Sequence, residues 1–433
     1  MTEEPPVRPV EAMTALERVL SPVSWWVGID SGWKEHQVCL LDRHGHVKGE
    51  RSFAHNGPGI AELCAWLLQQ TDAPPAQIAV AIEVPHGAVV ETLLERGFLV
   101  FAINPKQLDR FRDRFSVAGA KDDTRDAYVL ADSVRTDAHC FRHLALDHPL
   151  VLELREASRL AEELTQDRMR FINRLRDQLR RYFPQMLELA DDLGTEWVLA
   201  LLALAPTPAK AARLRQDRIA SLLKAHHVRR FDAADVLAIL RQPALHVAPG
   251  VTEGITATVA TLIARIRLVN RQLNQANRQL ATLCDKLAAE APLGQAGEQN
   301  DVAILDSLPG IGPIVLAILL AEAYGLLQRR DYQALRLLSG AAPLTKQSGR
   351  KRIVVMRYAC NQRLRNAVYH WARIAMQKDP LCRAQYHRLR GQGHSHGRAL
   401  RGIADRLLRV ACAMLTNRCA YDPHHHASKP AAA

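Results

Sequence analysis

The chain has 433 residues, and its 57 Lys and Arg outnumber its 45 Asp and Glu to give a formal net charge of +12. This length is typical of two or three domains with substantial cores, which excludes a small module held together by disulfides. No apolar run approaches the ~20 residues of a membrane-spanning helix, because WVLALLALA at 197–205 is too short.

The positive charge is concentrated near the C-terminal end. Residues 329–421 hold 20 Lys and Arg against three acids, which gives +17 in this stretch and leaves −5 for the rest of the chain. Such a concentration is typical of proteins that bind phosphate backbones. The alternative is a merely solvated face, but solvated faces usually mix both signs. We therefore expect a nucleic-acid-binding surface.

The cysteines and the first residues indicate an intracellular protein. The eight cysteines are scattered, with neither a CxxC pair nor zinc-ligand spacing, which predicts buried thiols in a reducing compartment. The first residues, MTEEPPVRPVEAM, are acidic and Pro-rich, unlike a signal peptide.

Strands alternate with helices after a flexible tail at 1–24. The apolar segment 25–39 begins as a strand and continues past a Gly, and 46–54 pairs with it as the next strand. The elements expected after these are a helix at 57–70, a strand at 78–84, a helix at 87–96, a strand at 98–104 and a helix at 123–135. This alternation predicts an α/β domain on one sheet, spanning 25–150. In such sheets active sites gather at strand ends.

The pattern becomes helical over 151–299. Residues 153–183 carry apolar positions three or four apart, and 259–287 keep this spacing for four heptads, which predicts a coiled-coil seam. The seam pairs either with 153–183 in an intrachain hairpin, which we favour, or with another subunit. Between these helices, 188–250 is a helical insertion in which nothing suggests chemistry.

A mainly helical C-terminal domain is expected over 300–421, before a tail at 422–433. Its segment SLPGIGPIVLAILLAEA is a Gly-containing turn that opens a helix, as in helix-hairpin-helix motifs. The backbone N–H groups near Gly310 and Gly312 suit a phosphate. The alternative is a tight turn between two helices.

Four acidic residues follow a pattern typical of a metal site. Asp30 ends the apolar run WWVGID, Glu83 ends IAVAIE, and Asp123 and Asp126 lie three residues apart on a predicted helix. At an effective dielectric of about 20, two carboxylates ~5 Å apart repel each other by roughly 3 kcal/mol. Four together therefore need a cation, and oxygen-only ligands suit Mg²⁺ or Mn²⁺, the metals of phosphoryl transfer.

Alternatives remain open around the helical pair. Asp122 and Asp126 are four residues apart, so Asp122 rather than Asp123 is an alternative ligand. A DDxxD on a helix, taken alone, is usually a solvated face, and only the two strand-borne carboxylates favour a metal. Lys34 and Lys121 lie beside the acids in sequence and either contact phosphate or are ordinary surface lysines.

A serine lies among basic residues in the stretch LTKQSGRKR. Ser348 precedes a Gly on a short turn, and the cations around it are Lys346, Arg350, Lys351 and Arg352. Such a serine either donates a hydrogen bond to phosphate or acts as a nucleophile, because nearby guanidinium groups stabilise the alkoxide and the crowded phosphorus. In the later NQRLR stretch, Arg363 and Arg365 are further candidates for nucleic-acid contacts.

Together these motifs resemble one family. GIDSGWKEH, IEVPHG, AINPKQLDRFR, KDDTRDA, LPGIGP and QSGRKR followed by NQRLR occur in the order seen in the DEDD insertion-sequence transposases, the family numbered one hundred and ten, now known as bridge-RNA-guided recombinases. The resemblance covers roughly 25–185 and 300–421. Two features depart from the family: Cys360 replaces a usual Gly, and the insertion 188–250 lengthens the chain.

The resemblance implies an RNase H-like (RuvC-like) N-terminal domain whose acids Asp30, Glu83, Asp123 and Asp126 hold Mg²⁺ or Mn²⁺. It implies a C-terminal transposase domain in which Ser348 attacks DNA and forms a phosphoserine link. A structured noncoding guide RNA would pair with donor and target DNA. The subunits would form a homo-oligomer, a dimer to a tetramer, in which one subunit's acids meet another's serine. The expected location is cytoplasmic, at the nucleoid of a bacterium or archaeon.

Two other functions stay open at this point. A RuvC-like endonuclease or junction resolvase would hydrolyse DNA at the four acids without the serine, and a covalent protein–DNA adduct distinguishes the two enzymes. A non-catalytic nucleic-acid-binding scaffold would need no metal, which the presence of all four acids opposes.

Overall fold

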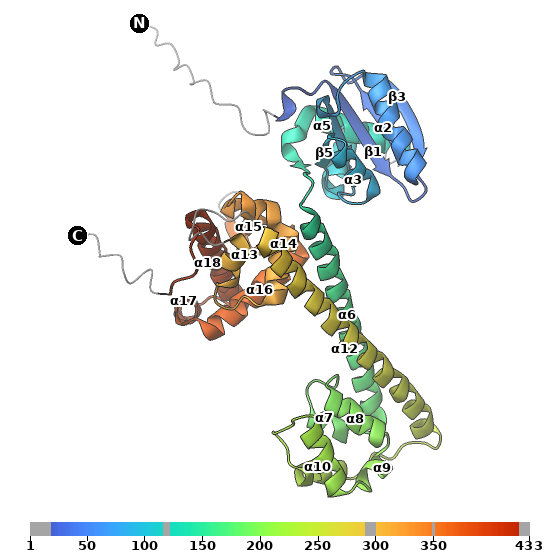
Figure 1. Ribbon diagram of the computed structural model, residues 1–433, viewed down its shortest axis with the longest axis vertical. Coiled ribbons are helices and arrows are strands. Elements are labelled where there is room, and N and C mark those ends of the chain that lie inside the picture. The colour runs from blue at the N-terminus through green and yellow to red at the C-terminus, as the bar shows by residue number, and fades with distance from the viewer. Residues whose placement is uncertain (1–18, 116–121, 291–299, 349–350, 424–433) are drawn as a thin grey trace, which may run out of the picture. The chain divides into compact units, whose positions relative to one another are not determined.

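The computed structural model describes residues 19–115, 122–290, 300–348 and 351–423, without the side chains of 351–352. The chain divides into two compact units, Met1–Leu146 and Asp147–Ala433. The first unit is mixed α/β with a central sheet, and the second is mostly helical (Figure 1). This confirms the coarse fold prediction of an α/β N-terminal part followed by a mainly helical part.

The first unit is built on a six-stranded sheet in the order β3-β2-β1-β4-β5-β6. The strands are β1 (Trp25–Ser31), β2 (Glu35–Leu41), β3 (Val47–Ala54), β4 (Ile78–Ile82), β5 (Leu99–Ala102) and β6 (Arg142–His143). Strands β1, β4 and β5 are parallel, whereas β2, β3 and β6 run antiparallel to their neighbours. The central strand β4 is buried along its whole length, as expected for a strand covered on both faces.

Helices cover both faces of this sheet. They are α2 (Gly57–Thr71), α3 (Ala88–Glu95), α4 (Pro105–Arg112) and α5 (Asp123–Asp137), with the short turns η1 (Pro75–Gln77) and η2 (Ala138–Cys140). The apolar sides of α2 and α3 share one core with the sheet, and those of α4 and α5 share a core on its opposite face.

Two local predictions in this unit were wrong. The segment 25–39 is not one strand but two, because the chain reverses at Gly32, whose N–H donates to the carbonyl of Glu35. The turn makes β1 and β2 an antiparallel pair. Helix α4 was not predicted; it begins after Asn104, whose side chain caps the N–H of Lys106, with a proline at its first position.

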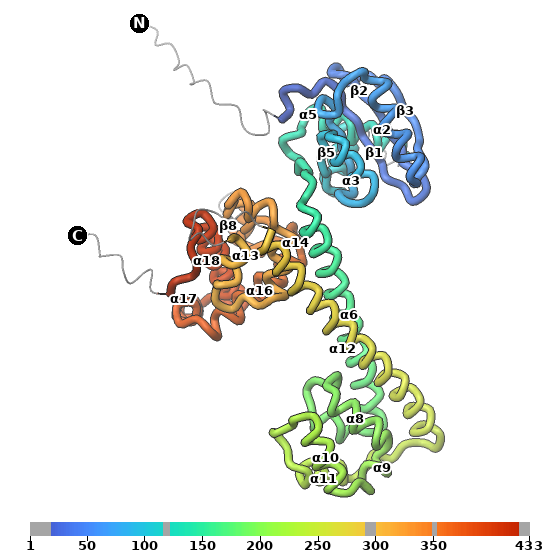
Figure 2. The backbone as a smooth tube through the Cα atoms, viewed as in Figure 1, coloured from blue at the N-terminus to red at the C-terminus, as the bar shows by residue number. Residues whose placement is uncertain are grey.

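The second unit contains two long helices, α6 (Pro149–Tyr182) and α12 (Val251–Glu290), which lie side by side (Figures 1 and 2). They run in opposite directions, because 151–161 share a core with 276–287 whereas 172–182 share another with 255–266. Between the two cores, Arg168 donates from Nε to the amide oxygen of Asn270 at 2.8 Å. The predicted seam positions of α12 are therefore covered by residues of the same chain.

The segment between the long helices forms a small helical cluster. Its helices are α7 (Gln185–Leu189), α8 (Glu196–Leu204), α9 (Pro208–Ala212), α10 (Gln216–Ala225) and α11 (Ala233–Leu240). Their apolar sides pack against the end of α6 and the start of α12. The insertion is thus folded around a core that it shares with the two long helices.

The C-terminal domain packs against the other end of the hairpin. It comprises α13 (Asp301–Asp306), α14 (Pro313–Gln328), α15 (Tyr332–Leu338), β7 (Leu344–Ser348), β8 (Lys351–Val355), α16 (Gln362–Lys378), α17 (Pro380–Gly391) and α18 (His396–Asn417). Trp371 of α16 is fully buried at its centre and donates to the carbonyl of Pro309 at 3.0 Å. Among the described residues, no helix is both long enough and apolar enough to span a membrane.

The cysteines match their prediction only in part. Cys39, Cys64, Cys284, Cys382 and Cys412 are buried, whereas Cys140 and Cys419 are exposed and Cys360 is half-buried. Cys140 lies in η2 and Cys419 follows α18, so both thiols sit at element ends rather than in a core.

Candidate active site and nucleic-acid interface

Two of the predicted acids lie at the ends of neighbouring parallel strands. In the pairing of β1 with β4, Ile29 is opposite Ile82. Asp30 and Glu83 follow these residues directly. Asp30 is still within β1, opposite Gln37 of β2, whereas Glu83 comes just after β4, so both lie at the same end of the two strands. Each is partly exposed. The sequence did not show that these two strands are neighbours in the sheet. The parallel pairing of β1 with β4 shows it.

The other two acids lie at the start of α5. Asp122 caps this helix by accepting from the N–H of Thr124, and Asp123 is its first residue and is exposed. Asp126 is 1% exposed. The cap uses one carboxylate oxygen of Asp122, 3.4 Å from the nitrogen of Thr124, so Asp122 and Asp123 both remain candidate ligands.

A glycine brings α5 directly onto the sheet. A Cβ atom added to Gly28 of β1 would lie 1.9 Å from the carbonyl oxygen of Ala127 and 2.6 Å from the nitrogen of Ala131. Only glycine permits this approach of helix to strand. Since Gly28 lies two residues before Asp30 and Ala127 follows Asp126, the contact brings these two acids into one region.

Arg112, at the end of α4, joins this region. It donates from Nε and Nη2 to the two oxygens of Asp126 at 2.5 and 2.7 Å, and from Nη1 to Asp109 at 2.5 Å. Burial opposes the charge of this guanidinium, but the bond to Asp126 and the charges of Asp126, Asp109 and Glu83 raise the pKa of Arg112 above its ordinary value.

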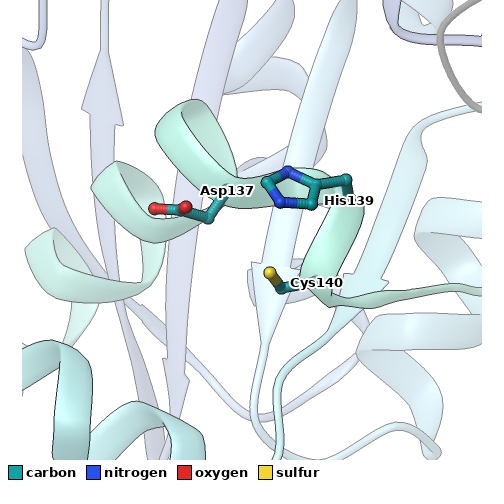
Figure 3. A group of neighbouring side chains, drawn as sticks. All are labelled: Asp137, His139 and Cys140. Atoms are coloured by element: carbon teal, nitrogen blue, oxygen red, sulfur yellow. The ribbon is translucent and has the colours of Figure 1, made fainter.

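The four acids do not form a closed metal cage in this arrangement. Within the part of the chain that the structure describes, one group of three potential ligands has all its ligand atoms within 4.8 Å of one another, and it consists of Asp137, His139 and Cys140 (Figure 3). It lies at the far end of α5 and in η2. Asp137 Oδ2 already accepts from Arg114 at 3.0 Å and from Thr136 at 2.7 Å, which accounts for its position without a metal.

The turn between β1 and β2 adds two exposed side chains next to Asp30. Lys34 is exposed there, as expected for a residue that contacts phosphate. Its neighbour Trp33 is 89% exposed. An exposed indole beside a basic residue suits stacking on a nucleobase, and no sequence pattern had indicated this role for Trp33. Lys121, the other predicted lysine, lies outside the described residues.

Ser348 is the last residue of β7 and is exposed. It pairs with Lys351 across an antiparallel hairpin in which Lys346 faces Ile353. Lys346 is also exposed on this hairpin. Arg350 and the side chains of Lys351 and Arg352 lie outside the described part. The hairpin thus presents the predicted serine to solvent at its turn.

The two arginines of NQRLR have different surroundings. Arg363 donates from Nε to Glu162 of α6 at 2.5 Å, which ties α16 to the long hairpin. Arg365 donates to the carbonyl of Arg357 and to the side chain of Gln362, and forms no ion pair among the described residues. Arg365 is therefore the better candidate for an anion.

The two glycines of the LPGIGP turn also differ. Gly310 has φ +82°, and an added Cβ would lie 2.5 Å from the backbone nitrogen of Ala375 in α16. Gly310 lies between α13 and α14, where the alternative prediction placed a tight turn between two helices, and it also packs closely on α16. Gly312 caps α14, and an added Cβ there meets nothing within 4 Å. Gly312 remains the candidate for a phosphate contact.

Comparison with known proteins matches both ends of the chain to transposases. A DEDD transposase family of the IS110 type matches residues 27–184, and the family described as "Transposase IS116/IS110/IS902 family" matches residues 302–387. The chain is 55% identical over 53% of its length to the candidate transposase y4uE of Sinorhizobium fredii, of whose own length it spans 62%.

Other relatives are matched over nearly their whole length. The chain is 33% identical to the mini-circle candidate transposase for IS117 of Streptomyces coelicolor, covering 88% of this chain and 91% of that protein. It is 27% identical to the 44.8 kDa protein of insertion element IS116 of Streptomyces clavuligerus, over 92% and 96% of the two lengths. The fold and these matches define an insertion-sequence transposase. The chain belongs to the IS110/IS116 family of transposases.

Proposed function

We propose that this transposase is an RNA-guided DNA recombinase that cuts and rejoins strands through a covalent bond between Ser348 and DNA. The N-terminal unit would be an RNase H-like (RuvC-like) domain holding Mg²⁺ or Mn²⁺ at Asp30, Glu83, Asp123 and Asp126. The strand order 3-2-1-4-5, with β1, β4 and β5 parallel and acids at the strand ends, supports this domain type.

The carboxylates suit a hard divalent cation by their donor atoms. All four offer oxygen only, the ligand set preferred by Mg²⁺ and Mn²⁺. The buried carboxylate of Asp126 already neutralises a cation of the protein, the Arg112 guanidinium. Such a metal would act as a Lewis acid on the scissile phosphate.

The serine step exchanges one phosphate ester for another. Ser348 Oγ attacks the phosphorus and its proton passes to water, while the bond to one deoxyribose oxygen breaks and that oxygen takes up a proton. In the second step, a hydroxyl of another strand attacks the same phosphorus and releases the serine with its proton restored. The phosphoester energy is conserved, so no nucleoside triphosphate is needed. Lys346 and the neighbouring cations hold the phosphate during both steps.

The acids and the serine lie on different units of the chain, with the α6–α12 hairpin between them in sequence. We propose that the protein acts as a homo-oligomer, a dimer to a tetramer, in which one subunit's acids meet another subunit's serine. The guide would be a structured noncoding RNA that pairs with donor and target DNA. Sequencing the RNA that co-purifies with the protein tests this part, because a discrete species is expected.

One observation carries the proposal: the exposed Ser348 lies at the turn of a hairpin whose strand also carries the exposed Lys346, in a chain whose Asp30 and Glu83 directly follow the paired Ile29 and Ile82. A hydrolytic nuclease needs only the acids. The serine gives the recombinase its distinguishing chemistry.

The test is a covalent adduct. Wild-type protein, incubated with Mg²⁺ and labelled DNA that carries the ends of its element, should form a protein–DNA band that survives denaturation. Mass spectrometry should place the nucleotide on Ser348. The Ser348→Ala variant should bind DNA and RNA but form no adduct, whereas Thr345→Ala, which removes an exposed hydroxyl from the same strand, should behave like the wild type. Recombination by Ser348→Ala at the wild-type rate would end the serine proposal, and cleavage without any adduct would favour a hydrolytic nuclease.

A further inference from the structure

The C-terminal domain contains a cavity of about 230 Å³ that none of the steps above uses. Its wall is formed by the turn after α15, by α16, by the start of α18 and by the residue after β8. Its lining residues include Met356, Arg365, Asn366, Tyr369, Gly397 and Arg401. All of them belong to the second unit.

The floor of this cavity is apolar and its rim is cationic. Val368, Leu400 and Ala404 are buried side chains of α16 and α18, and Tyr369 adds an aromatic ring. The charged lining residues are two arginines, Arg365 and Arg401, and none of the described residues that line the cavity is acidic. This combination of apolar wall and positive rim is unlike a core void, which has no charged lining.

The arginines have no acidic partner. Over the part of the chain that the structure describes, neither Arg365 nor Arg401 forms an ion pair, and the Nε of Arg365 is buried without a hydrogen-bond partner. Burial, followed by the charges of Arg398 and Arg365, lowers the pKa of Arg401. Arg401 is thus repelled by two neighbouring guanidinium groups, and an anion at the rim of the cavity would relieve this repulsion.

The size and chemistry of the cavity indicate its ligand. It is smaller than the ~300–1,000 Å³ pockets that take drug-sized ligands, but it accommodates one flat ring system. Apolar and aromatic walls suit the faces of a nucleobase, Asn366 offers an amide to its edge, and the arginines suit the attached phosphate. We propose that this cavity binds one unstacked nucleotide of a DNA strand, with the base inside and its phosphate on Arg365 and Arg401.

The position of the cavity favours DNA. Met356 of its wall directly follows β8, and the pairing of Leu344 with Val355 places this end of the hairpin four residues from Ser348. At a rise of ~3.3 Å per residue, that distance is about 13 Å along the strand. A nucleotide in the cavity would therefore belong to the strand that the serine attacks. The DNA assignment rests on the proposed function, whereas nucleotide binding itself does not.

A side chain next to the cavity offers a place for the adjacent base. Tyr358 is 76% exposed, and the guanidinium of Arg365 lies 5.7 Å from its ring centroid. A stacked Arg–Tyr pair presents a flat face to a base that leaves the duplex.

The test measures binding of single nucleotides to the full-length protein by NMR chemical shifts. The probes are the four 2′-deoxynucleoside 5′-monophosphates, their ribonucleotide counterparts, the free nucleosides and inorganic phosphate. At least one deoxynucleotide should bind saturably, more tightly than its nucleoside or phosphate alone. Two variants separate base from phosphate: Gly397→Leu fills the cavity, and Arg401→Gln removes a rim charge.

Each variant has a matched control. An added Cβ meets nothing within 4 Å at Gly397 or at Gly391, but only Gly397 lines the cavity, so Gly391→Leu should bind like the wild type. Arg373→Gln removes an exposed charge from the same domain and should also leave binding unchanged. Gly397→Leu and Arg401→Gln should each weaken nucleotide binding about tenfold or more.

Several outcomes would overturn the inference. One is wild-type affinity in Gly397→Leu; another is inorganic phosphate that binds as tightly as every nucleotide. Ribonucleotides bound tenfold more tightly than their deoxy counterparts would assign the cavity to RNA instead. The Ser348→Ala variant should bind nucleotides normally. If the protein forms the serine adduct but binds no nucleotide, only this inference is wrong. If it binds nucleotides but forms no serine adduct, only the proposed function is wrong.

Discussion

Arg112 holds both carboxylate oxygens of Asp126, one of the four predicted DEDD acids, at 2.5 and 2.7 Å. Asp126 is almost fully buried, so its charge would be costly without this partner. The guanidinium therefore stands where a metal would otherwise neutralise the acid. If the acids bind a divalent cation, that cation and Arg112 compete for Asp126 or share it.

Replacing Arg112 should make the protein depend on a metal for stability. In EDTA, Arg112→Gln leaves the buried carboxylate unpaired, which should reduce the free energy of unfolding by about 3–5 kcal/mol. Added Mg²⁺ should restore much of this loss, because it can neutralise the same carboxylate. Thermal unfolding with and without Mg²⁺ measures the effect.

The matched control is Arg114→Gln. Arg114 pairs with Asp137 at 3.0 Å, where the two side chains are 50% and 29% exposed, so the loss should be at most about 1 kcal/mol and insensitive to Mg²⁺. Equal Mg²⁺ responses in the two variants would contradict a metal site at Asp126.

The Asp126→Asn variant should lose DNA strand transfer together with its response to Mg²⁺. The amide cannot supply the charge that a divalent cation needs, although it fills the same space. Activity is measured as recombined DNA across a Mg²⁺ titration, with Asp109→Asn as the control, because Asp109 contacts only the outer Nη1 of Arg112. Strand transfer that persists in EDTA would refute the metal mechanism for the wild type.

The Gly28→Ala variant should separate α5 from the sheet. The new methyl group would lie 1.9 Å from the carbonyl oxygen of Ala127, a backbone atom that cannot yield without moving the helix. We expect unfolding to become easier by about 1–3 kcal/mol, and activity to fall because Asp126 moves with α5. In the control Gly57→Ala, the added atom meets nothing within 4 Å, and stability should hardly change. Equal stability of both variants would show that the contact is looser than described.

The stability of the first unit should fall as the pH falls below about 6.5. His36 is 2% exposed, its Nε2 lies 2.7 Å from Nδ1 of His55, and its Nδ1 has no partner among the described residues. Burial, and then the charge of His55, lower the pKa of His36 below its ordinary value. The imidazole of His36 therefore binds a proton more readily in the unfolded chain than in the folded one. The stability contributed by neutral His36 is present above the pKa of the unfolded chain and is lost as the pH falls through it.

Thermal unfolding between pH 5 and pH 8 tests this expectation. The variant His36→Gln should show a flatter pH dependence than the wild type. The variant His86→Gln, which replaces an exposed imidazole, should keep the wild-type dependence. An unchanged slope in His36→Gln would assign the acid sensitivity to other groups.

Much of the fold could be predicted because its patterns are local. The buried strand at β4, the helix at α5 and the apolar spacing of α12 follow from residues within one element. The hairpin at Gly32 was missed because two strands joined by a tight turn and one longer strand show the same alternation of apolar and polar residues on either side of the turn. Helix α4 was missed because its eight residues carry mostly polar side chains and only Leu108 is buried.

The sequence by itself determined which chemical groups this protein carries: four acids in the DEDD pattern, a serine among cations and a basic C-terminal quarter. These properties depend on residue types and on their spacing within one helix or strand, which can be read from a short stretch of sequence. The tertiary structure alone decided which groups meet. The parallel register of β1 and β4 aligns Asp30 with Glu83, the bare backbone of Gly28 admits α5, and the packing of α4 brings Arg112 onto Asp126. Such contacts arise from the joint packing of distant elements, so no local pattern encodes them.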